Sequence, residues 1–479
     1  MKFERALIIA QDEWRYWRRS RLGGASCFVA FLLIVASLVS TVTRVESERE
    51  TRENFQVLAK QTFESQPARH PHRMIHYGHY VFRTPPPLSM IDPGIDAYAG
   101  TIMFLEGHRQ NSAVFSPRYS GAQAGPLAQL SPAFTYQMLI PLALIILGFA
   151  SITREREAKT DYLLFASSVT PTELWMGKTA ALSVAALISL IPLCIGLSIA
   201  VSAGAGTSEA LYLLLGYALY LIFWVILISA ASALADRAAS AFSTLASCWV
   251  LLCVVIPPLA GNLASASAPT QGRIASDLAV VHALHNAGDG HNANDPAFTR
   301  LRTQLLEQYD VEDVADLPIN FRGVVAQASE REQGQILNLF ANERMAGEKE
   351  QTLLVHWLGI LSPTLAIKNF SVATSGTDLR EHQHFQRKAE AIRYDFVQKL
   401  NSMHTQELSY RDDIQRSSDR AAEQRTRVSP SNWRILDNIR NPADHTLKDV
   451  VSTLPHLLIL AVWSALLALI GLIVVRHVD

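Results

Sequence analysis

The sequence predicts a mainly α-helical integral membrane protein, a six-helix transmembrane bundle with a largely helical extracytoplasmic domain. Three observations predict this class. Apolar residues make up 49% of the 479 residues, and charged residues only 18%. The apolar residues are clustered, and several windows exceed the roughly 18 nearly uncharged residues that a helix needs to cross a bilayer. Two long polar segments lie between these windows.

The chain begins with an amphipathic segment, residues 1–22, that we expect to form a cytoplasmic helix at the membrane interface. Its basic residues alternate with apolar ones and with Trp14 and Trp17, which is typical of a helix lying along a membrane surface. A disordered basic tail is the alternative. The next apolar stretch is longer than that of a signal peptide and lacks a small-residue cleavage pattern, so we expect it to be retained as the first span.

Six windows are expected to span the membrane as helices, because backbone groups in lipid must find their hydrogen bonds within the segment. Their many alanine, serine and glycine residues favour close helix packing. Ionisable residues are nearly absent from them, which argues against an ion-coupled carrier. The predicted spans are residues 23–45, 132–152, 174–203, 209–234, 240–262 and 453–475.

Lysine and arginine residues gather in the short flanks on one side of these spans. They include six in the amino-terminal flank, Arg154 and Arg156 in the loop at 153–173, and Arg237. By the positive-inside rule this side is cytoplasmic, so we expect both termini in the cytoplasm. The formal net charge of −1 gives no reason to expect nucleic-acid binding.

Residues 46–131 and 263–452 are the two polar segments expected outside the membrane. The first is rich in Pro, His and Tyr, and we expect loop and short strands packed on the second. The second should be mostly helical, because apolar residues recur every three or four positions between 385 and 400. The apolar stretch 353–361 is too short to span and ends at a Ser-Pro pair, so a helix touching the outer leaflet is favoured over a seventh span.

The most informative motif lies in the loop at 153–173 and runs into the third span. Its positions are Glu155, Arg156, Glu157, Thr160, Leu163, Leu164, Pro171, Gly177 and Lys178. This run resembles the coupling helix of ABC-2 type ABC transporter permeases, which carries Glu-Arg-Glu-x-Gly-Thr-Leu-x-x-Leu-Leu, then Pro and Gly-Lys. The chain departs from that pattern at Arg154 and Lys159, where the family usually has glycine. An ordinary charged loop is the alternative.

The resemblance implies that residues 153–173 dock into a groove of an ABC ATP-binding subunit, with Leu163, Leu164 and Phe165 facing the membrane bundle. ATP-driven closure of that subunit then becomes rotation of the attached spans. It also implies ABC-2 (type V exporter-like) architecture in the inner (plasma) membrane of a bacterium. The expected partners are two ATP-binding subunits, a second permease (identical or a similar sister) and the lipid bilayer. ATP and Mg²⁺ are expected in the partner subunit, with no cofactor and no enzymatic activity in this chain.

The resemblance extends beyond this loop to one branch of ABC-2 permeases. That branch has two large extracytoplasmic segments, a domain of unknown function in its carboxy-terminal half, and some relatives labelled copper-enzyme-maturation permeases. The residues that carry this likeness include Asp92-Pro93-Gly94, Leu105-Glu106, His108, Thr377-Asp378, Phe385, Glu390 and Arg393.

Four histidines within ten residues, His70, His72, His76 and His79, are candidate metal ligands. Imidazole suits copper or zinc, and a permease domain outside the membrane could hand on a metal. Against this, no cysteine lies nearby and no carboxylate lies between residues 65 and 91. Histidines that lie on the surface or are hydrogen-bonded within the fold are the alternative.

Other function classes find less support in the sequence. Gly177-Lys178-Thr179 ends like a phosphate loop, but Thr172 stands where that loop needs glycine, so we interpret the match as chance. No Gly-x-Ser-x-Gly or zinc-protease motif indicates a hydrolase. The alternative to a permease is a membrane-anchored receptor or assembly factor that binds a periplasmic protein partner without transport.

Overall fold

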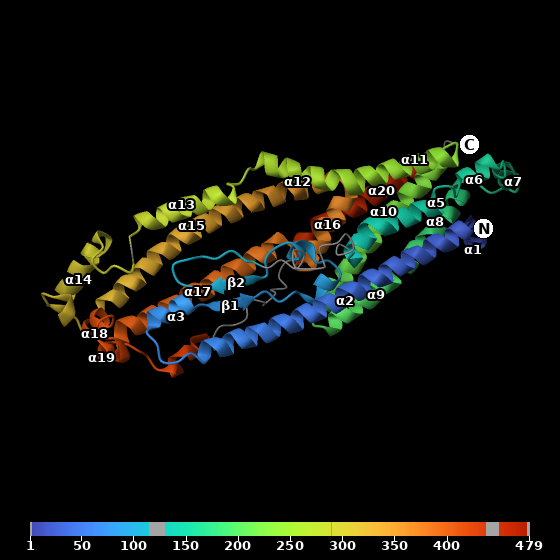
Figure 1. Cartoon of the computed structure of the whole chain (residues 1–479). Helices are drawn as coiled ribbons and strands as arrows, with labels where there is room; N and C mark the ends of the chain where they lie inside the picture. Colours follow the sequence, from blue (N-terminus) through green and yellow to red (C-terminus); the bar gives the residue numbers. More distant parts are fainter. Residues whose placement is uncertain (1, 115–129, 289, 437–449, 477–479) are drawn as a thin grey trace.

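The computed structural model describes residues 2–114, 130–288, 290–436 and 450–476. The molecule is elongated and mainly helical (Figure 1). Both chain ends lie near α6 (Thr153–Glu157) and α7 (Asp161–Ala166), while α18 (Tyr410–Gln415) and α19 (Arg420–Arg425) lie at the opposite end. Parts of the two predicted polar segments, 115–129, 289 and 437–449, lie outside the described residues.

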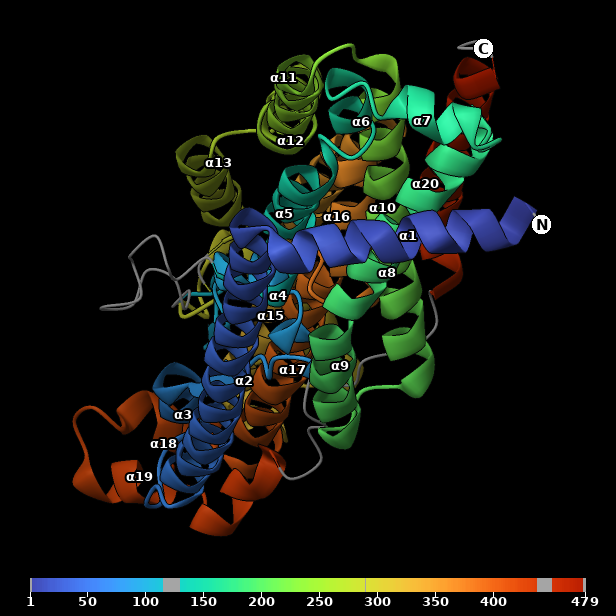
Figure 2. The same cartoon turned by 90° about the vertical axis from the view of Figure 1, so that its right-hand side faces the viewer.

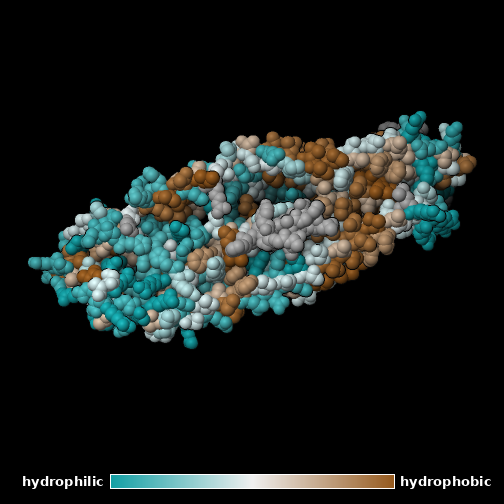
Figure 3. Space-filling view, in the orientation of Figure 1, coloured by the Kyte–Doolittle hydropathy of each residue, from teal (hydrophilic) through white to brown (hydrophobic). Residues whose placement is uncertain are grey.

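Among the described residues, six helical stretches are long and apolar enough to cross a membrane, as predicted. A hydrophobic belt covers this part of the molecule between two hydrophilic ends (Figure 3). Three of the stretches are made of successive helices, and the later helix has a proline in its first turn, where a proline is tolerated. The stretches are formed by α2 (Arg21–Glu64); α4 (Pro132–Phe134), the π-helical turn η6 (Thr135–Leu139), α5 (Ile140–Gly148) and α6; α8 (Pro171–Ser189) and α9 (Ile191–Ser202); α10 (Thr207–Leu234); α11 (Ala238–Trp249), the π-helical turn η7 (Val250–Val255) and α12 (Ile256–Ser267); and α20 (Val450–Arg476).

Helix α1 (Lys2–Arg19) confirms the predicted amino-terminal helix, and the disordered-tail alternative is wrong. It runs crosswise over the bundle in Figure 2 and packs on α8. Its buried face carries Ala6, Ile9, Glu13 and Trp17. These positions are spaced by three or four residues, as expected for one side of a helix.

Helix α2 continues to Glu64, well past the predicted end of the first span at residue 45. Its polar half is stabilised by an ion pair four residues apart, Glu48 with Arg52 at 3.2 Å. Its far end is held by Phe63, which packs edge-on against Phe396 with ring centroids 5.4 Å apart. One uninterrupted helix therefore runs from the bundle into the polar part of the molecule.

The polar lobe is made of the short strands and the helices that flank them in the two polar segments. Strands β1 (His79–Phe82) and β2 (Ile102–Leu105) pair antiparallel, with His79 opposite Leu105, and their inner face packs on Phe385. This confirms the short strands predicted for the first segment. The elements are α3 (Pro71–Tyr77), β1 (His79–Phe82), β2 (Ile102–Leu105), α13 (Arg273–Asn286), α14 (Thr299–Tyr309), α15 (Phe321–Leu358), α17 (Leu379–Glu407), α18 and α19, with short 3-10 turns at Pro87–Met90, Gly94–Ala97, Pro296–Phe298, Val314–Asp316 and Pro430–Leu436.

Helix α16 (Pro363–Thr374) belongs to the second polar segment but packs inside the bundle. Its buried Phe370 lies so close to Gly216 of α10 that a side chain at Gly216 would clash with the ring. The apolar stretch 353–361 is the end of α15 and a short 3-10 turn, Gly359–Leu361. It is not among the six candidate spans.

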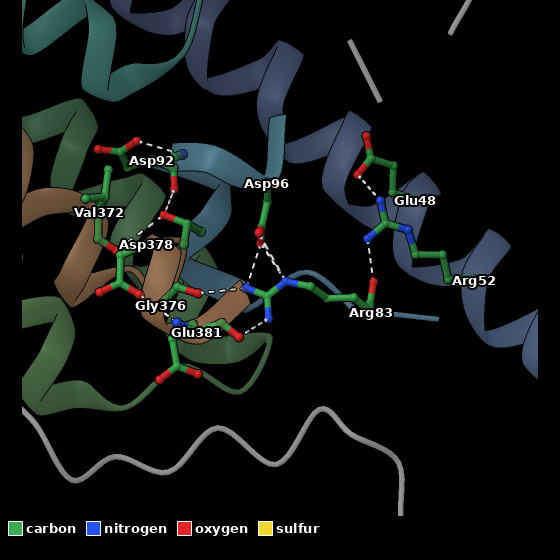
Figure 4. Close-up of polar contacts among 11 residues, drawn as sticks. Glu48, Arg52, Arg83, Asp92, Asp96, Val372, Gly376, Asp378 and Glu381 are labelled. Atoms are coloured by element: carbon green, nitrogen blue, oxygen red, sulfur yellow. Dashed lines mark hydrogen bonds and ion pairs between the residues drawn. The ribbon is translucent and has the colours of Figure 1, made fainter. Parts of the chain in front are cut away.

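A buried arginine joins the first polar segment to the turn between α16 and α17 (Figure 4). Arg83 is 5% exposed and binds both carboxylate oxygens of Asp96 at 2.9–3.1 Å. Its remaining N–H groups donate to the backbone oxygens of Gly376 and Glu381. Arg52 of α2 donates in turn to the backbone oxygen of Arg83 at 2.6 Å. This joint therefore connects three parts of the chain that are far apart in sequence.

Candidate functional site

The segment between α5 and α8 folds into two short helices, α6 and α7. Helix α6 forms the end of the second candidate span, and α7 lies between the second and third candidate spans. Pro171 occupies the first turn of α8. The helix begins with a capping box: Thr170 Oγ1 accepts from the Glu173 N–H, and Glu173 accepts from the Thr170 N–H. These local signals fix where the loop ends and the apolar helix begins.

A buried network of charges ties this loop to α1 and α8. The Lys178 ammonium donates to Glu13 at 2.6 Å and to Glu155 at 2.9 Å. Arg154 also donates to Glu13, at 2.7 Å, and Thr160 Oγ1 donates to Glu155 at 2.7 Å. Glu13 is fully buried and Lys178 is 3% exposed, so both charges depend on their ion pairs within the network for compensation.

The next two residues of the motif hold the turn between α10 and α11. Arg156 donates to the backbone oxygens of Ala233 and Ala235 at the carboxyl end of α10. Glu157 accepts from the Ala238 N–H at the amino end of α11, at 2.9 Å. A cation at a helix carboxyl end and an anion at an amino end both complement the helix dipole. The charged residues of the motif are therefore engaged with neighbouring helices of the chain itself.

Helix α7 presents most of its apolar side chains to the outside. Leu164 packs with Ile152 and Leu174, as expected from the sequence. The expectation that Leu163 and Phe165 also face the bundle is wrong, since they are 71% and 39% exposed. Consecutive residues of a helix point about 100° apart, so three in a row cannot share one face. Tyr162, also 71% exposed, joins Leu163 and Phe165 in what we term the α7 tip.

The turn between α6 and α7 contains a left-handed residue where the related motif has glycine. Lys159 has φ of +57°, which is costly for a residue with a Cβ atom. Lys159→Gly should therefore raise the free energy of unfolding by about 0.5–1 kcal/mol, measured by denaturant unfolding of the purified chain. Ala158→Gly is the control, because Ala158 is right-handed and should gain nothing. Equal effects at both positions would contradict strain at Lys159.

The four histidines predicted as metal ligands divide among three places. His72 and His76 lie on one face of α3, with their Nε2 atoms 3.2 Å apart. His70 caps α3 and is buried beside Asp413. His79 lies in β1, 3.3 Å from the side-chain amide of Gln56. The structure therefore brings together two of the four.

His72 and His76 are joined by two histidines that the sequence analysis did not assign to a metal. His108 follows β2, and His291 lies in the connection after α13. One ring nitrogen from each of the four lies within 4.8 Å of the others. Because these residues come from segments far apart in the chain, spacing in the sequence gave no signal for them.

A second group, His70, His404 and Asp413, is buried. Asp413 accepts hydrogen bonds from His404 at 2.7 Å, from His70 at 3.2 Å and from the amide of Asn320 at 3.2 Å. Although burial opposes it, the hydrogen bonds from His404 and His70 lower the pKa of Asp413. Burial lowers the pKa of His70 to about 4. These contacts describe a structural joint among α3, α15, α17 and α18.

Sequence reasoning also missed the network partner Glu13. A signal was present: Glu13 falls in helical register with Ala6, Ile9 and Trp17, on the apolar face of the first helix. An acid on such a face needs a buried cation as partner. Lys178, the last residue of the recognised motif, supplies it.

Comparison with known proteins gives one match. A family model described as Domain of unknown function (DUF3526) matches residues 273–439. This range includes α13 to α19, and with them His291, Asp413 and the inserted helix α16. Neither the curated proteins nor the solved structures give a match. Over this part, the chain is similar to a family that carries no assigned activity.

Proposed function

We propose that this chain is the transmembrane permease subunit of an ATP-driven ABC transporter of the ABC-2 type. It would couple ATP hydrolysis in a separate subunit to movement or extraction of a cargo. The observation that carries the proposal is the α7 tip. Tyr162, Leu163 and Phe165 are exposed on a loop whose sequence resembles a coupling helix. Exposed apolar side chains at the hydrophilic end of the bundle (Figure 3) suit docking to another protein.

The contacts behind the tip support a mechanical role. Glu155 binds Lys178 of α8, and Arg156 and Glu157 bind the ends of α10 and α11. Through Arg154 and Glu13 the same loop is bound to α1. A displacement of the loop would thus be passed to four helices together, as a rigid-body movement. In this proposal the α7 tip contacts the partner subunit. The charged residues of the motif connect the tip to the helices of the bundle.

The proposal includes a definite arrangement of partners. Two ABC ATP-binding subunits, which hold ATP and Mg²⁺, would dock at the α7 tips of two permease chains, either identical or similar sisters. The α6–α7 end and both termini would then lie in the cytoplasm of a bacterium, with the bundle in the inner membrane. The polar lobe would lie on the other side, where it could contact cargo or a periplasmic protein.

Leu163→Asp tests this docking surface. The chain would be co-expressed with the ATP-binding subunit encoded beside it, purified in lipid, and assayed for co-purification and ATP turnover. A charge at an interface anchor should weaken the complex by about tenfold or more and lower turnover accordingly. Because Leu163 is 71% exposed, the isolated chain should remain folded.

Leu339→Asp is the matched control, because Leu339 is 57% exposed in the middle of α15, outside the proposed docking surface. It should leave the complex and its turnover unchanged. If the wild-type chain associates with no ATP-binding subunit, the permease proposal fails. The receptor or assembly factor that binds a periplasmic protein would then be the better account.

A further inference from the structure

Four imidazole rings from three separate segments meet on the surface of the polar lobe. His72 and His76 come from α3, His108 from the turn after β2, and His291 from the connection after α13. All six pairs of rings have centroids between 4.7 and 5.9 Å apart. We propose that these four histidines form a binding site for one divalent transition-metal ion of the zinc or copper class.

The spacing of the nitrogen atoms fits a single ion. Zn–N bonds of about 2.0–2.1 Å place two tetrahedral ligand atoms about 3.3 Å apart. The Nε2 atoms of His72 and His76 are 3.2 Å apart. One ring nitrogen from each of the four histidines lies within 4.8 Å of the other three. Binding one ion therefore requires side-chain movements of about an ångström. Four imidazoles without a thiolate or carboxylate favour zinc or copper over calcium or magnesium.

His108 has the surroundings of an oriented metal ligand. Its Nδ1 atom lies 3.2 Å from Gln333 Oε1 and 3.5 Å from Glu330. Its Nε2 atom is buried and has no hydrogen-bond partner among the residues that the structure describes. A ligating histidine commonly donates its second ring N–H to a carboxylate or carbonyl. The backbone of His108 is also fixed, by the hydrogen bond from its N–H to Glu330 at 3.3 Å.

Burial opposes protonation at three of the four rings. It lowers the pKa of His72 to about 2 and lowers the pKa values of His76 and His108 from their ordinary range. Neutral imidazole is the form of histidine that binds a metal ion. The neighbouring group of His70, His404 and Asp413 differs, because the Asp413 oxygens already accept hydrogen bonds from Asn320 and from both histidines.

A bound ion would join parts of the chain that belong to different polar segments. His72, His76 and His108 precede the second candidate span, whereas His291 follows the fifth. The ion would thus add a cross-link between α3 and the connection that follows α13. This site is independent of the proposed transport function, and its test does not require a partner subunit.

Metal titration of the full chain in lipid nanodiscs tests the site. The protein would first be stripped with a chelator and then titrated separately with Zn²⁺ and with Cu²⁺. Bound metal would be counted by mass spectrometry, and affinity measured by competition with a chromophoric chelator. We expect one ion per chain for at least one of the two metals. His76→Gln and His291→Gln should each weaken its binding by about tenfold or more.

His285→Gln is the matched control, because His285 is an exposed histidine of α13 outside the cluster. It should bind the metal like the wild type. His76 and His291 are themselves exposed, so their variants should keep the thermal stability of the metal-free chain. Absence of stoichiometric binding of both metals, or equal affinity in the wild type and both cluster variants, would overturn the proposal.

Discussion

Replacement of Arg393 by methionine is expected to lower the free energy of unfolding by about 3–5 kcal/mol, because it leaves buried carboxylates without their cation. Arg393 is 1% exposed and lies between two acids, Glu330 and Glu390. It binds Glu330 at 2.6 Å and both oxygens of Glu390 at 2.7 and 2.8 Å. The loss would be measured by denaturant unfolding of the purified chain, followed by tryptophan fluorescence.

Two further variants separate charge from packing at this site. Neutralising both acids in the same chain, Arg393→Met with Glu330→Gln and Glu390→Gln, should recover part of the loss, because no uncompensated charge remains buried. Arg387→Met, at an exposed arginine of the same helix, should change stability by no more than about 0.5 kcal/mol. If the triple variant is no more stable than Arg393→Met alone, buried charge is not the cause.

Lys178→Met is expected to have the second-largest effect, a loss of about 3 kcal/mol together with reduced coupling to ATP turnover. The substitution removes the shared cation of Glu13 and Glu155. The effect should fall at the lower end of the range for a broken buried pair, since Arg154 still contacts Glu13 at 2.7 Å. Thermal unfolding and ATPase assays of the complex in lipid would measure the two losses.

Adding Glu13→Gln to Lys178→Met should restore part of the stability, because the amide needs no cation. Coupling should stay low, since α1 and α8 would still lack their ionic link to the loop. Lys159→Met, at an exposed lysine of the same loop, is the control and should leave both properties near wild type. Full stability in Lys178→Met alone would contradict a buried network.

The spans, the amino-terminal helix and the two short strands could be predicted because each depends on a local pattern. A hydropathy window or an amphipathic repeat lies within one stretch of chain. Helix α16 could not be placed in this way. It lies in a polar segment, and its position follows from the fit of Phe370 against Gly216, which are far apart in the sequence.

The candidate sites show the same difference between local patterns, which could be predicted, and tertiary contacts, which could not. The charged motif was recognised from spacing, but the partners of Arg156 and Glu157 are backbone atoms at the ends of α10 and α11. His72 and His76 were singled out because four histidines fall within ten residues, but the helix α3 that places these two on one face was not predicted. His108 and His291 join that pair only through tertiary packing of the lobe, and no local pattern encodes it.

The unbroken length of α2 has a mechanical consequence. Its 44 residues extend about 66 Å at 1.5 Å per residue. One end packs closely against α1, where Gly23 lies against the Trp17 backbone, and the other is anchored by Phe63. If α2 moves as a rigid body, tilting it by about 10° at the bundle would displace its far end by about 11 Å. A small change of helix angle in the bundle would therefore become a large displacement in the polar lobe.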